Sequence, residues 1–202
     1  MKKLFLLAFA GILLAGCNKE DEISSEFKLE GGESHEVTGA VINLYDRSPE
    51  ETNYEVYLLL DGYTWQDYLV EDYCAFIYFD MYFDEEVSEL PEGTYRLGNG
   101  EILDNGDYSS YSATKDEYAE FTSGTLTISK KGDNYTFSFD GMADLYVYDA
   151  ETDEEETLGR KSFKCSYSGP VEHHEEDFGD DYYDEPGNGN GSAPARMMKK
   201  GR

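Results

Sequence analysis

The chain has 202 residues, of which 44 are acidic and 16 are lysine or arginine, so its formal net charge at neutral pH is −28. A surface of this charge repels phosphate backbones, which excludes nucleic-acid binding as a function class. Aromatic residues make up 15% of the chain, too many for a wholly disordered acidic protein, and the length suits one domain with a substantial core.

The first seventeen residues have the features of an export signal. Lys2 and Lys3 precede an apolar run over residues 4–14. This run is too short to cross roughly 30 Å of hydrocarbon as a helix, but it suits the apolar region of a signal peptide. The stretch ends in Leu14-Ala15-Gly16-Cys17. A plain secretory signal with a coincidental cysteine is the alternative interpretation.

These last four residues resemble the lipobox of bacterial lipoproteins. In that family the signal peptide, here residues 1–16, is cut before the cysteine, and the cysteine is acylated. The resemblance therefore implies a lipid anchor of palmitate type at Cys17, and contact with a membrane through that anchor.

The five residues after the cysteine, Asn-Lys-Glu-Asp-Glu at 18–22, resemble the lysine-and-acid patch of surface-exposed lipoproteins of the Bacteroidota type. That resemblance implies an address on the outer face of the outer membrane. A solvated tether accounts for the same residues without an address.

Residues 17–32 are polar, and we expect them to form a flexible, disordered tether. A β domain is expected over residues 33–171, because the hydrophobic pattern there has a period of two. Strands are expected at residues 37–45, 54–61, 73–84, 94–97, 101–103, 124–129, 135–140, 143–149 and 162–167. The expected core comprises Val56, Leu58, Ile77, Phe79, Met81, Leu126, Ile128, Phe137, Phe139, Leu145 and Phe163.

The fold class predicted from this pattern is all-β, an antiparallel barrel or sandwich of about eight to nine strands. The clearest signal is a hairpin, in which residues 124–129 and 135–140 alternate around Gly132 and Asn134. A strand of twelve residues at 73–84 favours a barrel over a sandwich, because long strands bend around barrels. We expect loops over most of residues 98–120 and no sizeable helix. The last three strands resemble a pattern in small Bacteroidota lipoproteins, some of which have calycin-like or sandwich folds.

After Pro170 the composition changes to an acidic and then basic low-complexity tail, residues 172–202, which we expect to be disordered. His173 and His174, flanked by acids, could ligate a metal. Adjacent side chains of an extended segment point opposite ways, however, so a solvated tail is the favoured interpretation.

The segment from Asp104 to Asp107 fails the calcium-loop pattern, because its twelfth position is Lys115. No metal site and no cofactor are therefore predicted. The acidity of the chain could still recruit divalent cations loosely.

Cys74 and Cys165 could form a disulfide in an exported protein. Alternation places Cys165 on the inward face of its strand and Cys74 on the less apolar face. Two sulfurs on opposite faces of a sheet are too far apart to bond. The favoured interpretation is therefore that each cysteine is a separate, small hydrophobic residue. A catalytic cysteine is disfavoured, since the only histidine within the expected domain is His35.

An outward set of aromatic residues is the candidate ligand-binding site: Tyr57, Tyr78, Tyr82, Tyr146 and Tyr148, with Trp65 in a nearby loop. Aromatic platforms stack on sugar rings and other flat apolar faces, so the partner class would be a surface glycan or a protein. Tyrosine also suits half-exposed strand positions without any ligand.

Motifs of the common hydrolases, metalloproteases and phosphate-binding loops are missing from the sequence, so no catalytic residue is predicted. The function predicted is a non-catalytic binding or accessory role at the outer-membrane surface. Two alternatives stay open. One is an extracellular polymer hydrolase that uses a carboxylate pair, and the other is a purely structural envelope protein.

Overall fold

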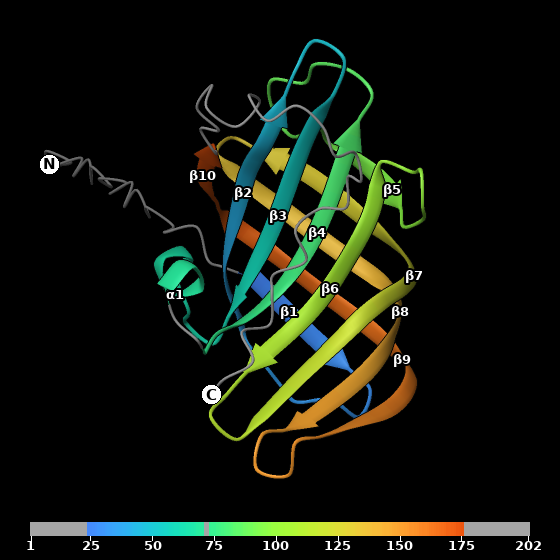
Figure 1. The fold of residues 1–202 in the computed structure, drawn as a ribbon. Helices are drawn as coiled ribbons and strands as arrows, with labels where there is room; N and C mark the ends of the chain where they lie inside the picture. The colour runs from blue at the N-terminus through green and yellow to red at the C-terminus, as the bar shows by residue number, and fades with distance from the viewer. Residues whose placement is uncertain (1–23, 71–72, 176–202) are drawn as a thin grey trace, which may run out of the picture.

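The structure, a computed structural model, describes residues 24–70 and 73–175, and within these ranges the chain folds into ten strands and one short helix (Figure 1). The strands are β1 (Ser24–Leu29), β2 (Val37–Arg47), β3 (Thr52–Leu60), β4 (Ala75–Phe83), β5 (Gly93–Arg96), β6 (Leu103–Tyr111), β7 (Lys115–Lys131), β8 (Asn134–Asp149), β9 (Glu154–Pro170) and β10 (Glu172–Glu175). The helix, α1 (Trp65–Val70), lies between β3 and β4.

All ten strands belong to one strongly curled sheet, a half-barrel. Its strand order is β1-β9-β8-β7-β6-β4-β3-β2-β10, with β5 paired to β7 beside this path. The all-β prediction is confirmed. The sheet is mixed rather than wholly antiparallel, because β10 runs parallel to β2. This exception follows from connectivity, since β9 passes through Val171 directly into β10 and brings it beside β2 in the same direction.

The core fills the space between two walls of the half-barrel. In Figure 1, β2, β3, β4 and β6 form a front wall, and β8, β9 and β1 cross behind it at an angle. Every core residue predicted from the sequence is buried. Aromatic rings dominate the middle, where the centroid of the Phe121 ring lies 4.7 Å from that of Phe139 and 4.6 Å from that of Phe163. The interior is therefore packed with side chains rather than hollow.

Two glycines let β7 and β8 approach closely at the centre of this core. Gly124 of β7 pairs with Gly141 of β8, and the Phe139 ring lies against both. A Cβ atom on Gly141 would lie only 2.2 Å from the backbone oxygen of Ser123. At Gly141 glycine is therefore required by space.

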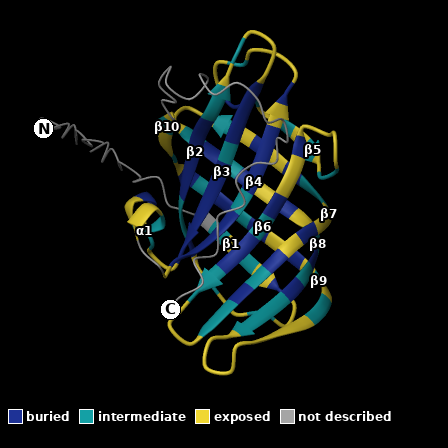
Figure 2. Cartoon of the chain, in the orientation of Figure 1, coloured by how far each residue is buried: buried dark blue, intermediate teal, exposed yellow. Residues whose placement is uncertain are grey.

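The two walls differ in how they are buried, as Figure 2 shows. Residues of β3 and β4 are buried on both faces of the sheet, whereas β8 and β9 alternate between buried and accessible positions. Part of the outer face of the front wall is covered by α1 and carries a second cluster, here called the outer cluster. Its buried members are Val41, Tyr57, Leu59, Trp65, Cys74 and Phe76.

The helix α1 was not predicted, because six residues are too few to show a helical period. Its start is nevertheless encoded locally. The Asp67 carboxylate accepts hydrogen bonds from the Thr64 backbone N–H and hydroxyl, and the Asp67 N–H donates to the Thr64 hydroxyl. This is the reciprocal arrangement of a capping box.

Two strands lie outside the expected domain range of 33–171. β1 falls in the stretch expected to be a flexible tether, where Phe27 and Leu29 alternate with polar residues and pair against β9. β10 falls in the stretch expected to be a disordered tail. The predicted signal peptide, Cys17 and residues 176–202 lie outside the described residues.

In the middle of the chain the observed strands differ from those predicted from the sequence. Residues 98–120, expected to be mostly loop, contain β6 and the first part of β7. Their inward positions include the small residues Gly106 and Ala119, which hide the apolar alternation. The strands expected at 135–140 and 143–149 are one continuous strand, β8, since Gly141 and Met142 keep the pairing to both neighbours.

Candidate functional site

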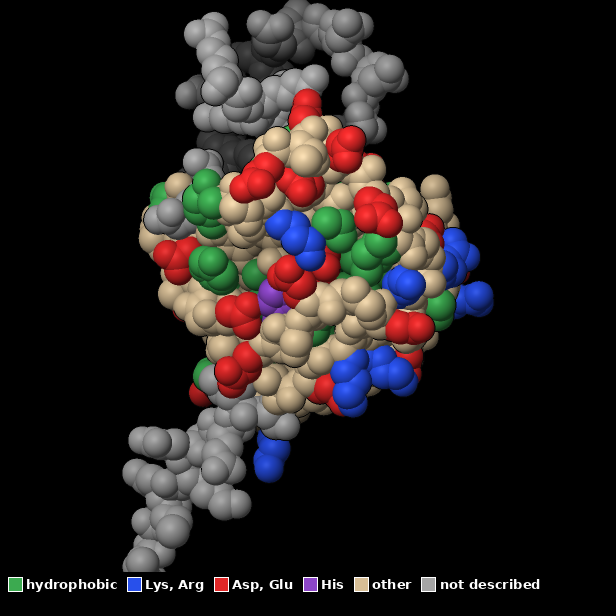
Figure 3. Space-filling view, turned by 90° about the horizontal axis from the view of Figure 1, so that it is seen from below, with side chains coloured by type: hydrophobic (Ala, Val, Ile, Leu, Met, Phe, Trp, Pro, Cys, Tyr) green, Lys and Arg blue, Asp and Glu red, His purple; other side chains and the backbone are tan. Residues whose placement is uncertain are grey.

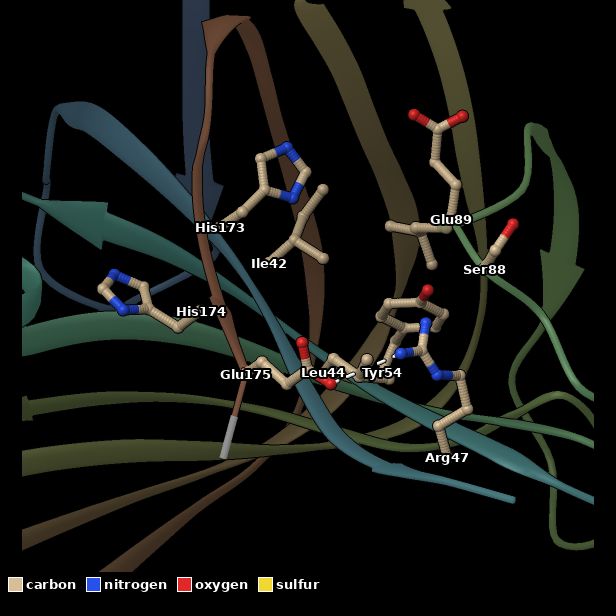
Figure 4. Close-up of a pocket in the computed structure, with 10 residues that line it drawn as sticks. Ile42, Leu44, Arg47, Tyr54, Ser88, Glu89, His173, His174 and Glu175 are labelled. Atoms are coloured by element: carbon tan, nitrogen blue, oxygen red, sulfur yellow. Dashed lines mark hydrogen bonds and ion pairs between the residues drawn. The ribbon is translucent and has the colours of Figure 1, made fainter. Parts of the chain in front are cut away.

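A pocket of about 510 Å³ opens where β2 lies beside β10, next to the segment that joins β4 to β5 (Figure 4). We call it the β2–β10 pocket. It is lined by Ile42, Leu44, Arg47, Tyr54, Ser88, Glu89, Leu90, His173, His174 and Glu175. Its size falls within the range of small-molecule sites.

The apolar lining of the pocket continues the interior core. Ile42 and Leu44 of β2, Tyr54 of β3 and Leu90 are all buried members of the core cluster. The Tyr54 hydroxyl donates to the backbone oxygen of Val87 at 3.1 Å, which fixes the ring. Burial raises the pKa of Tyr54, so its hydroxyl keeps its proton at neutral pH.

Two ion pairs lie among the polar residues of the pocket. Arg47 at the end of β2 pairs with Glu175 of β10, with 3.4 Å between the guanidinium Nη2 and the carboxylate Oε1 (Figure 4). Glu89 pairs with Lys130 at the end of β7. Hydrogen bonding to Lys130 lowers the pKa of Glu89, so this carboxylate stays ionised rather than serving as a proton donor.

The two histidines of β10 point to opposite sides of the strand, as Figure 4 shows and as strand alternation requires. His174 stacks on Trp65 of α1, with ring centroids 5.3 Å apart. His173 is directed toward the pocket. Burial, assisted by Lys130, lowers the pKa of His173, so at neutral pH its ring is an uncharged donor and acceptor.

Tyr135 of β8 lies beside the lining residues and is fully buried. Its ring centroid is 6.1 Å from that of His173, and the Lys130 ammonium lies 5.0 Å from its ring centroid. Apart from the Lys130 ammonium, which interacts with it, its hydroxyl has no hydrogen-bond partner among the described residues. Burial raises the pKa of Tyr135. Its hydroxyl therefore keeps its proton at neutral pH.

The structure brings together only part of the aromatic set predicted from the sequence. Tyr57 and Trp65 belong to the outer cluster, and Tyr78 packs against it. The Tyr57 centroid lies 4.9 Å from that of Trp65 and 5.1 Å from that of Tyr78. Trp65 is only 8% exposed. These rings therefore pack under α1 and do not form an open stacking platform.

The other predicted tyrosines lie elsewhere. Tyr82, near the end of β4, is 40% exposed. Tyr146 of β8 stacks on Tyr118 of β7 at 4.8 Å, and the hydroxyl of Tyr148 donates to Asp153. The predicted set is thus divided among separate places on the fold.

Sequence reasoning missed the β2–β10 pocket because it assigned residues 172–202 to a low-complexity tail. A signal was present. The period-two alternation of β9 continues from Cys165 and Tyr167 through Val171 to His173. Following that period past Pro170 would have placed His173 on the same face as the core.

A partly buried chain of hydrogen bonds lies away from this pocket. His35 contacts Asp61 through Nδ1 at 2.5 Å and the Tyr108 hydroxyl through Nε2 at 2.6 Å. Tyr108 in turn contacts Glu117 at 3.1 Å, and Glu117 accepts the backbone N–H of Glu33 at 2.8 Å. Tyr108 is 0% exposed, so a substrate cannot reach it. The chain therefore ties the segment before β2 to β6 and β7.

Cys74 and Cys165 lie on opposite sides of the sheet, as alternation predicted. Cys74 belongs to the outer cluster and Cys165 to the interior core. The structure does not pair them, which supports their interpretation as separate small hydrophobes. Burial raises the pKa of Cys165 above the range in which a thiolate forms at neutral pH.

Asp107 of β6 and Glu120 of β7 face each other as a cross-strand pair. Burial and the like charge of Glu120 raise the pKa of Asp107 to about 7, against about 3.9 for an ordinary aspartate. The folded state therefore holds a proton that the unfolded state releases between about pH 4 and 7. Stability should fall as pH rises through this window, with the full loss reached above pH 7.

We expect Asp107→Asn to raise the free energy of unfolding at pH 8 by about 2 kcal/mol, and to change it little below pH 4. Urea denaturation at several pH values between 4 and 8 measures the free energy of unfolding of both proteins. Asp133→Asn, at an exposed turn acid, is the control and should leave the pH profile unchanged. Equal pH profiles for Asp107→Asn and the wild type would contradict a raised pKa.

The acidic composition is visible on the surface. Acidic side chains are scattered among basic ones on the face seen from below (Figure 3). In the described ranges, no group of three histidine, cysteine or acidic side chains is placed to hold a metal ion. The segment from Asp104 to Asp107 that was compared with a calcium loop lies in β6.

Comparison with protein-family models, with curated proteins and with solved structures found no match to this chain. None of the helical residues in the described part of the chain forms a helix long and apolar enough to cross a membrane. The fold and the pocket define a class: a β half-barrel with a packed interior and a ligand-sized opening beside β10.

Proposed function

We propose that this protein is a lipoprotein of the outer membrane, anchored through Cys17 and displayed at the cell surface, with a non-catalytic binding role. Its β domain would serve as a calycin-like scaffold. The ligand would bind at the β2–β10 pocket rather than at the aromatic set first considered. The anchor and the address rest on the lipobox and on the acidic patch that follows it.

The observation that carries the binding role is the composition of the pocket. It combines an apolar lining, contributed by Ile42, Leu44 and Tyr54, with a few fixed polar groups, as small-molecule sites do. Catalysis by a carboxylate pair is disfavoured there. Both lining acids, Glu89 and Glu175, are ion-paired, and a general acid would need a raised pKa rather than the lowered one of Glu89.

Lipid labelling tests the anchor. Cells that express the full chain are grown with a palmitate analogue, and we expect the wild type to be labelled and Cys17→Ala to be unlabelled. Cys74→Ala serves as the cysteine control and should be labelled like the wild type. Equal labelling of Cys17→Ala would contradict the lipobox assignment.

External protease tests the address in the same cells. Because the domain is proposed to face outward, protease added to intact cells should degrade it. Protection in intact cells together with loss in lysed cells would contradict surface display.

A further inference from the structure

We infer that the β2–β10 pocket binds an uncharged, polyhydroxylated ligand, namely a neutral saccharide unit. This inference rests on the proposed binding function and names the chemical class of its ligand. It follows from three features of the pocket: balanced charge, alternating hydrogen-bond donors and acceptors, and an apolar floor.

The charges of the pocket are balanced one to one. Arg47 is paired with Glu175, and Lys130 with Glu89, while His173 is uncharged at neutral pH because burial lowers its pKa. In a chain with a net charge of −28, the average composition would predict an excess of acidic groups at such a site. An anionic ligand would have to displace Glu175 or Glu89 from its cation, and a cationic ligand would have to displace Arg47 or Lys130. Either displacement breaks an ion pair, whereas an uncharged ligand can bind with both pairs intact.

The polar groups suit hydroxyl groups. Each ion pair places a charged donor beside a charged acceptor, and a sugar hydroxyl can donate and accept at the same time. The neutral His173 ring and the Ser88 hydroxyl also offer both roles.

The floor supplies the apolar contact that a saccharide ring needs. Tyr54, Ile42 and Leu44 are held in the core cluster, and the hydrogen bond to Val87 keeps the Tyr54 ring in place. The three residues are 4%, 2% and 8% exposed, so they offer a ligand apolar edges at the base of the pocket rather than an open stacking face. A pocket of about 510 Å³ accommodates a ligand of this size class.

The test is calorimetry on the full chain carrying Cys17→Ala, which removes the anchor site and keeps the described domain intact. Three probe classes are compared: neutral gluco-, manno- and galacto-oligosaccharides, uronic-acid oligosaccharides, and short acidic and basic peptides. We expect a neutral oligosaccharide to bind, with an affinity that changes by less than about twofold between 50 and 500 mM NaCl, since no net charge is exchanged.

Variants locate the binding. Arg47→Met should weaken it by about tenfold or more, because it removes the guanidinium donor from the pocket lining and its ion pair with Glu175. Arg160→Met is the matched control, since Arg160 forms an equivalent ion pair with Asp144 between β8 and β9, and it should bind like the wild type.

Binding of a charged probe that is lost in Arg47→Met would overturn the saccharide class and leave the binding function standing. Failure of every probe class to bind would overturn both. Neutral saccharide binding that Arg47→Met does not weaken would overturn the assignment to this pocket.

Discussion

Replacing Phe139 by alanine should lower the free energy of unfolding by about 3–5 kcal/mol. The side chain is 1% exposed and lies among Phe79, Phe121 and Phe163, with ring centroids 5.3, 4.7 and 6.1 Å away. Its removal leaves a cavity between the two walls, which rigid paired strands cannot close. Urea denaturation followed by tryptophan fluorescence measures the loss.

Leu69→Ala is the control for this substitution, because Leu69 is 57% exposed and surface changes of this kind usually stay within about 0.5 kcal/mol. If Phe139→Ala fails to fold, Phe139→Leu should show a smaller loss in the same direction. A loss below about 1 kcal/mol for Phe139→Ala would contradict a packed interior.

Gly141→Ala should destabilise the fold by about 3 kcal/mol or more, although it adds a single methyl group. That methyl would lie 2.2 Å from the backbone oxygen of Ser123 and 2.7 Å from the Phe139 ring. The backbone oxygen belongs to the paired strand β7 and cannot move without disturbing the pairing of β7 with β8. Thermal and urea denaturation measure the effect.

Gly39→Ala provides the matched comparison, because a Cβ on Gly39 meets only the Leu59 side chain at 3.6 Å, an ordinary contact. We expect no loss of stability there. If Gly141→Ala and Gly39→Ala behave alike, the close approach of β7 and β8 is absent in solution.

Much of the fold could be predicted because period-two alternation is a local property. The inward residues of β3 and β4, such as Val56 and Phe79, are apolar at every second position, and such a pattern identifies the face of each strand that points into the interior core. The same rule placed Cys74 and Cys165 on opposite sides of the sheet.

The period-two pattern did not reveal strands whose inward-facing residues are small, nor an edge strand that consists mostly of polar residues. Gly106 and Ala119 face the core without giving a hydrophobic signal. β1 is six residues long and pairs on one side with β9. Its partner β9 is distant in sequence, which no local pattern reports.

The candidate site was hard to predict for a related reason. Arg47, Glu89 and His173 come from three separate parts of the chain, and their proximity depends on β10 lying parallel to β2. The abundant tyrosines instead led to the prediction of a binding site on the outer faces of the strands. Trp65 and Tyr57 prove to be packing residues of the outer cluster.

The most direct test of the binding site is amide NMR of the isotope-labelled full chain carrying Cys17→Ala, titrated with the neutral oligosaccharide that binds in calorimetry. The account predicts that the largest shifts occur at Ile42, Tyr54 and His173, around the β2–β10 pocket. Largest shifts at Trp65 and Tyr57 of the outer cluster, or at Tyr118 and Tyr146, would contradict it.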